Sequence, residues 1–130
     1  MESKEDKRME TKREVEFLSI EQLKEPIQLK TEIVDIPEKK GKVRIKALVG
    51  SERSEIMDLC QKPNGEPDAN MMQGLFIAYG ICKEDGSRVF NWLKDKEIIM
   101  NWPVGLLDRL SSKIMTLSGL NSTAQEKKMS

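Results

Sequence analysis

Acidic side chains are the residues of this chain that could most directly do catalytic chemistry, because the sequence contains no histidine. A general base that works near neutral pH is most often histidine, and two carboxylates can take its place only in a cleft that gives them different pKa values. Here the acids mostly alternate with lysines and arginines, which is typical of solvated faces. We therefore expect no catalytic residue and a non-enzymatic protein.

Metal and nucleotide chemistry find little support in the sequence. Cys60 and Cys82 lie far apart, lack the C-x-x-C spacing and have no histidine to complete a zinc site, so the sequence predicts two buried free thiols. The glycines at 74, 80 and 86 match neither the Rossmann nor the P-loop spacing, and no Gly-Lys-Ser or Gly-Lys-Thr occurs. We expect no metal and no cofactor.

A group of basic residues is the one feature that could bind phosphates. It has no interleaved aromatic side chains for base stacking and consists of Lys39, Lys40, Lys42, Arg44 and Lys46. The alternative is a solvated sheet face on which lysines protect an edge strand. Because lysine plus arginine equals aspartate plus glutamate at 22 each, the chain has no overall charge excess, and nucleic acid and membranes are poor partners.

Eight methionines point instead to protein binding, because their flexible thioether side chains adapt to partners of varied shape. The candidate partner-binding residues are Met71, Met72, Leu75, Phe76, Tyr79, Trp92 and Trp102. All but Met71 and the tryptophans also have the spacing of a buried helical stripe, so core packing is the alternative for those four. Each tryptophan is either an anchor between segments or an interface residue.

The elements that must position these residues begin with a predicted antiparallel hairpin. Apolar and polar residues alternate from Ile27 to Ile36, and the phase slips at Val34, which suggests a bulge or a twist. A turn at residues 37–41 leads to a second alternating run from Val43 to Ala47. An isolated hairpin of this kind is only marginally stable in water, so we expect helices to cover its apolar face.

Helices are predicted on both sides of the hairpin. Before it, Ser19 and Gln22 match a capping box that opens a short helix ended by Pro26, and we expect Ile20 and Leu23 to pack on the body. After it, four helices follow: Ser51 to about Lys62 with Ile56, Leu59 and Cys60 inward, Asp68 to about Gly80, Leu93 to Met100, and Val104 to about Ser118. An Asp-Gly turn between Ile81-Cys82 and Val89-Phe90 suggests a minimal second hairpin.

The 130 residues fit one domain. We predict a disordered charged arm at residues 1–14, a helix-rich α+β domain at residues 15–120 with the hairpin packed on about four helices, and a disordered tail at residues 121–130. No apolar run reaches the length of a membrane span, and the first residues do not form a signal sequence, so we expect a cytoplasmic protein.

The segment IVDIPEKKGKVRIKALVGSERSEIMDL, residues 33–59, resembles the opening of phage tail assembly chaperones, which are encoded beside the tape measure gene. In that family a strand ending in an xIP element, a glycine-containing turn, a VRIKxL-type strand and a GSER-type helix start follow in this order. GLFIAYGICKEDGSRVF, residues 74–90, and the end of the last helix around Ser118 are also similar to the family. The resemblance covers roughly residues 19–121.

The resemblance implies a helix-rich α+β fold and a chaperone that binds the tape measure protein and keeps it soluble until the tail tube polymerises. It further implies the tail tube protein and a frameshifted longer form as additional partners, action in the host cytoplasm and absence from the mature particle. The resemblance does not decide whether the chain forms a homo-oligomer. The alternatives are a minor structural or adaptor protein of the particle and, with less support, a small nucleic-acid-binding regulator that uses the lysine-rich hairpin.

Overall fold

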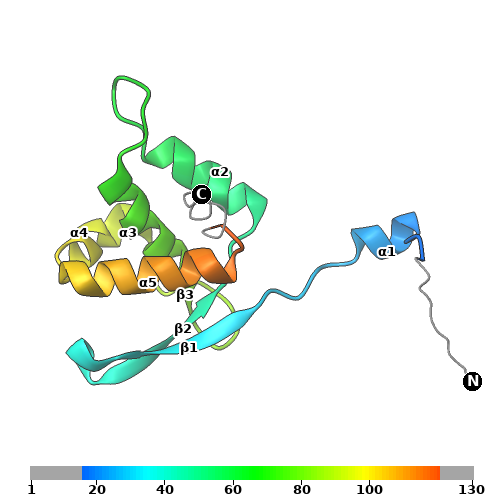
Figure 1. Ribbon diagram of the computed structural model, residues 1–130, viewed down its shortest axis with the longest axis horizontal. Helices are drawn as coiled ribbons and strands as arrows, with labels where there is room; N and C mark the ends of the chain where they lie inside the picture. The colour runs from blue at the N-terminus through cyan, green and yellow to red at the C-terminus, as the bar shows by residue number, and fades with distance from the viewer. Residues whose placement is uncertain (1–15, 121–130) are drawn as a thin grey trace, which may run out of the picture.

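The predicted hairpin is present in the computed structural model, which describes residues 16–120; the predicted arm at 1–14 and the tail at 121–130 lie outside the described residues. Strand β1 (Thr31–Ile36) pairs antiparallel with β2 (Gly41–Lys46) through a 3-10 turn, η1 (Pro37–Lys39). Lys40 closes this turn in the left-handed conformation, with φ of 55°. The turn lies at one end of the hairpin, and the chain enters at the other (Figure 1).

The predicted bulge is wrong, because the pairing runs without interruption from Thr31 opposite Lys46 to Ile36 opposite Gly41. The phase slip has a simpler cause. Val34 and Ile36 face the core and are buried, whereas Ile33 faces outward and is half exposed. Residues 27–30 precede the strand, so their alternation marks no sheet face.

The sheet has a third strand, β3 (Ile81–Cys82), which pairs antiparallel with β2. The predicted second hairpin is therefore only partly right. Cys82 forms a single bridge with Arg88 across the Asp-Gly turn, but β3 extends the first hairpin into a sheet with the order β1-β2-β3. The cause is burial, because Ile81 and Cys82 are both buried and the residues after the turn are mostly exposed.

Four helices form the rest of the body: α2 (Gly50–Leu59), α3 (Ala69–Gly80), α4 (Trp92–Met100) and α5 (Val104–Leu117). Of these, α3 and α5 pack on the strands β3 and β2. The predicted cap at Asp68 is confirmed, since its side chain accepts hydrogen bonds from the amides of Asn70 and Met71. Asn91 caps α4 in the same way. The predicted Ser51 cap is wrong, because α2 begins at Gly50 and the Glu52 carboxylate accepts from the Val49 amide instead.

Helix α3 is the centre of the core, with α2, α4 and α5 packed against it (Figure 1). Fully buried aliphatic side chains come from β2 and all four helices: Ile45, Ile56, Leu75, Ile77, Ile99, Leu106, Leu110 and Ile114. Ile56 and Cys60 are buried as predicted, but Leu59 is 39% exposed. The predicted α+β architecture of a hairpin on helices is confirmed.

The short helix α1 (Ile20–Lys24) does not pack on this body. Its capping box between Ser19 and Gln22 is present as predicted. However, Ile20 and Leu23 are each 66% exposed, so the predicted packing is wrong. The reason is the extended chain between α1 and β1, which carries the helix beyond the open end of the hairpin (Figure 1).

Candidate protein-binding groove

A groove of about 480 Å³ lies between α2, the start of α4 and the loop that joins β3 to α4. Its lining contains both apolar and polar side chains. Leu59 on α2 and Leu93 on α4 are 39% and 86% exposed, and Val89 on the loop is 47% exposed. The half-buried Phe90 and the buried Trp92 complete the apolar part of the lining, and polar residues form the rest. Exposed aliphatic side chains around an aromatic floor are suited to holding apolar side chains of another molecule.

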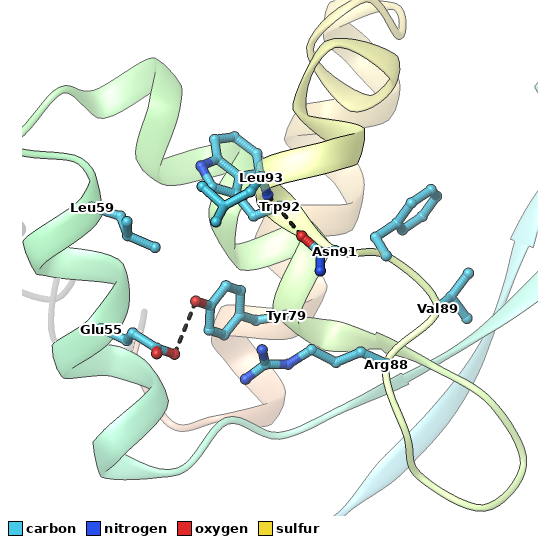
Figure 2. Close-up of a pocket in the computed structure, with 9 residues that line it drawn as sticks. Glu55, Leu59, Tyr79, Arg88, Val89, Asn91, Trp92 and Leu93 are labelled. Atoms are coloured by element: carbon cyan, nitrogen blue, oxygen red, sulfur yellow. Dashed lines mark hydrogen bonds between the residues drawn. The ribbon is translucent and has the colours of Figure 1, made fainter.

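The polar centre of this groove is a hydrogen-bonded set built around Tyr79 (Figure 2). The Tyr79 hydroxyl donates to Oε1 of Glu55 at 2.9 Å. The Arg88 guanidinium stacks on the Tyr79 ring, with Cζ 3.8 Å from the ring centroid. Burial raises the pKa of Tyr79 above its ordinary value, and the hydrogen bond to Glu55 adds to the increase. Tyr79 therefore remains neutral near pH 7 and serves as a fixed hydrogen-bond donor.

Glu52 lies outside the groove lining and binds Arg88, which is part of the lining. Its Oε2 pairs with Nη2 of Arg88 at 3.1 Å and with Nζ of Lys46 at 3.4 Å, and its Oε1 accepts from the Val49 amide at 3.0 Å. Burial would raise the pKa of Glu52, but the Val49 amide and the two cations together hold it below the ordinary value. The set ties α2, β2 and the 83–91 loop together, and so fixes the position of Arg88 in the groove.

The sequence-predicted partner-binding residues are divided between the core and the surface. Leu75, Phe76, Tyr79 and Trp92 are buried. For Leu75, Phe76 and Tyr79, this is the core position that their helical spacing offered as the alternative. Tyr79 and Trp92 line the groove. Met71 and Met72 are partly buried against the core and lie outside the groove lining. A partner-binding role for this set stays a prediction.

Trp102 lies away from the groove, near the hairpin turn. Its ring meets Phe90 edge-on, with centroids 5.8 Å apart, and Lys39 Nζ lies 5.8 Å from the Trp102 centroid. Lys39 and Lys46 of the basic group are thus engaged with Trp102 and Glu52. Part of the cationic group therefore serves the fold, which agrees with the interpretation as a sheet face.

Sequence reasoning missed the apolar groove residues Leu59, Val89 and Leu93. It also missed Glu55 and Arg88, which each contact Tyr79. No periodic signal marks them, because they come from separate elements and meet only in the folded chain. Cys60 and Cys82 are buried and free, as predicted, and burial raises the pKa of Cys82. Within residues 16–120, no cluster of three or more Cys, Asp or Glu is placed to hold a metal, and no helix is long and apolar enough to cross a bilayer.

Comparisons with known proteins give a structural match without a sequence match. No protein-family model matches the chain, and no curated protein matches its sequence. Among solved structures, the tail assembly chaperone of bacteriophage HK97 superimposes with a TM-score of 0.55 at 19% identity, covering 75% of this chain and 91% of that one. This chain is therefore similar in fold to the HK97 tail assembly chaperone.

Proposed function

We propose that this protein is a phage tail assembly chaperone that binds the tape measure protein and keeps it soluble until the tail tube polymerises. The observation that carries the proposal is the fold shared with the HK97 tail assembly chaperone over 91% of that chain. The order of the motifs in residues 33–59 supports it independently, because it resembles the same family. The proposed role is non-enzymatic, takes place in the host cytoplasm and ends before the particle is complete.

The groove supplies a physical mechanism for this role. A tape measure protein is long and helical with an apolar stripe, and such a surface aggregates when it is left uncovered. An amphipathic helix binds by laying its apolar face into a hydrophobic groove. In the proposed complex, apolar side chains of the tape measure helix contact Leu59, Val89 and Leu93, and the Tyr79 set meets the polar edge of that helix.

Removal of the chaperone is as important as binding, because the tube must replace it. One groove of about 480 Å³ offers a modest contact. Many modest contacts along one partner add to a large total, and each can be released separately. We therefore propose that several copies cover each tape measure molecule and that tube subunits displace them one by one.

The test is co-expression with the tape measure protein of the same phage. The soluble fraction of the tape measure protein is measured by centrifugation, with and without this chain, and its complex is isolated through a tag. Support requires a several-fold gain in soluble tape measure protein and its co-purification. A tape measure protein that stays insoluble and does not co-purify contradicts the proposal.

A second experiment distinguishes the structural alternative. Mass spectrometry of purified particles measures whether this chain remains in them. A chaperone that is displaced is absent or present only in traces, whereas a minor structural or adaptor protein is present in fixed copy number.

A further inference from the structure

A second, more apolar pocket lies at the turn end of the hairpin, outside the groove. We call it the turn pocket. Its volume is about 210 Å³. Its apolar lining comes from the three strands, the turn before α5 and the start of α5, and consists of Ile36, Val43, Ile81, Trp102 and Leu106. Two exposed cations, Lys39 and Lys42, stand at its rim. The turn pocket therefore favours an apolar side chain that has acidic neighbours.

A segment with this chemistry lies at the other end of the same chain. We call residues 16–27 the arm segment, and every one of them is exposed. Its large apolar side chains are 60% to 95% exposed: Phe17 95%, Leu18 60%, Ile20 66%, Leu23 66% and Ile27 85%. Five such side chains in twelve residues form an apolar surface that no described part of the same chain covers.

Charge and size match Phe17 to the turn pocket. The arm segment has three glutamates, Glu16, Glu21 and Glu25, against the single cation Lys24, which is a net charge of −2. The two lysines at the rim of the turn pocket are positive, so their charge is opposite to that of the arm segment. An apolar cavity of about 150 Å³ is large enough to bind benzene, so a pocket of about 210 Å³ has room for a phenylalanine ring.

The position of the arm segment favours a second copy as its partner. The arm leaves the hairpin at the end where β1 begins, whereas the turn pocket lies at the end where β1 stops and β2 starts (Figure 1). The extended residues 25–30 place α1 on the side away from the turn (Figure 1). A neighbouring chain can present its turn pocket to this arm without any rearrangement of the body.

We propose that the arm segment of one copy docks on the turn pocket of a second copy, with Phe17 inserted beside Trp102. Glu16 and Glu21 then face Lys39 and Lys42 of the second copy. The contact is head-to-tail, since the two surfaces are different parts of the chain. It involves neither Leu59 nor Leu93, so it leaves the groove free.

Two variants remove the two halves of the contact. Phe17→Asp removes the inserted ring and places a carboxylate there, without touching the body. Gly41→Leu blocks the turn pocket, because residue 41 shares its side of β2 with Val43, and a Cβ there meets nothing closer than the Lys39 carbonyl oxygen at 3.9 Å. Ile98→Asp, at a 55% exposed position outside both surfaces, is the matched control.

Sedimentation equilibrium from micromolar to millimolar concentrations measures the outcome. The apparent mass of the wild type and of Ile98→Asp should rise above the monomer mass of 14.9 kDa as the concentration increases. The apparent mass of Phe17→Asp alone, and of Gly41→Leu alone, should stay at the monomer mass. An equimolar mixture of Phe17→Asp and Gly41→Leu should form a 1:1 dimer, because the first still has an open pocket and the second an intact arm. Circular dichroism spectra that match the wild type establish that both variants fold.

Three results would overturn the proposal. A wild-type chain that stays monomeric over the whole range contradicts it, whether the arm is free or folds back on its own pocket. Self-association that survives Phe17→Asp places the contact elsewhere. Two folded variants that each lose self-association but fail to pair when mixed show that the arm and the pocket are not the two halves of one contact. The result is independent of the proposed function, because no tape measure protein is present.

Discussion

The hydroxyl of Ser118, at the end of α5, accepts a hydrogen bond from the backbone amide of Leu48 at 2.9 Å. The same hydroxyl donates to the Ile114 carbonyl at 2.7 Å. One side chain thus satisfies two backbone groups and joins the last helix to the segment between β2 and α2. Seventy residues of chain separate Leu48 from Ser118, so the bond joins the two ends of the segment that contains helices α2 to α5.

Ser118→Ala should destabilise the protein by about 1 to 3 kcal/mol, because the partly buried Leu48 amide loses its acceptor. Urea unfolding followed by circular dichroism measures the change. Ser112→Ala, at an exposed position of the same helix, is the control and should alter stability by less than about 0.5 kcal/mol. Equal effects of the two substitutions would show that the Leu48 bond contributes nothing.

Glu52→Gln should destabilise the protein by about 1 to 3 kcal/mol near neutral pH, because Arg88 and Lys46 lose their common anion. The effect depends on pH in a defined direction. The folded pKa of Glu52 lies below its ordinary value of 4.5, so the stabilisation is complete above that pH and disappears as pH falls through the folded pKa. Wild type and variant should therefore converge in stability on acidification.

Unfolding free energies measured in urea at a series of pH values from neutral to strongly acidic test this convergence. The exposed Glu84 provides the matched control, and Glu84→Gln should leave neutral-pH stability within about 0.5 kcal/mol of the wild type. A wild-type advantage over Glu52→Gln that persists undiminished in acid would contradict the electrostatic origin.

Gly80→Ala should destabilise the protein by about 1 to 3 kcal/mol through overpacking. A Cβ at Gly80 would lie 2.5 Å from Cδ1 and 2.8 Å from Cγ1 of Ile114, which is fully buried on α5. Gly105→Ala is the control, because a Cβ there meets nothing within 4 Å and alanine favours the helix. Thermal unfolding should show a lower midpoint for the first and an equal or higher midpoint for the second.

Local signals were enough to predict much of the fold. The hairpin, the Asp68 cap and the capping box at Ser19 all depend on residues within a few positions of one another, and all three are present. The position of α1 and the pairing of β3 with β2 depend on contacts between distant parts of the chain. Periodicity contains no information on such contacts, so the predicted packing of α1 was wrong and the predicted second hairpin was only partly right.

The candidate site shows the same division. Tyr79 and Trp92 could be named in advance because aromatic residues stand out in the sequence, and both line the groove. Leu59 was predicted to face inward from its spacing with Ile56, but it lies at the last residue of α2, where one side faces the groove. A surface assembled from the ends of two helices and a loop is formed by tertiary packing alone.

Leu93→Ser should weaken binding of the tape measure protein while leaving the chaperone folded. Leu93 is 86% exposed at the start of α4, so its loss removes almost no core contact, and the change in stability should stay near 0.5 kcal/mol. In the proposed complex the same side chain is covered by the partner, so its removal should reduce the soluble yield several-fold in co-expression. Retention of the wild-type yield would exclude Leu93 as a contact.

Ile98→Ser gives this comparison its control within the same helix. Ile98 is 55% exposed and lies outside the groove lining, so both substitutions remove one exposed aliphatic side chain from α4. If binding depended only on the general apolar character of the surface, the two variants would lose yield equally. A groove with a defined position predicts loss for Leu93→Ser alone, because of the two side chains only Leu93 lines the groove.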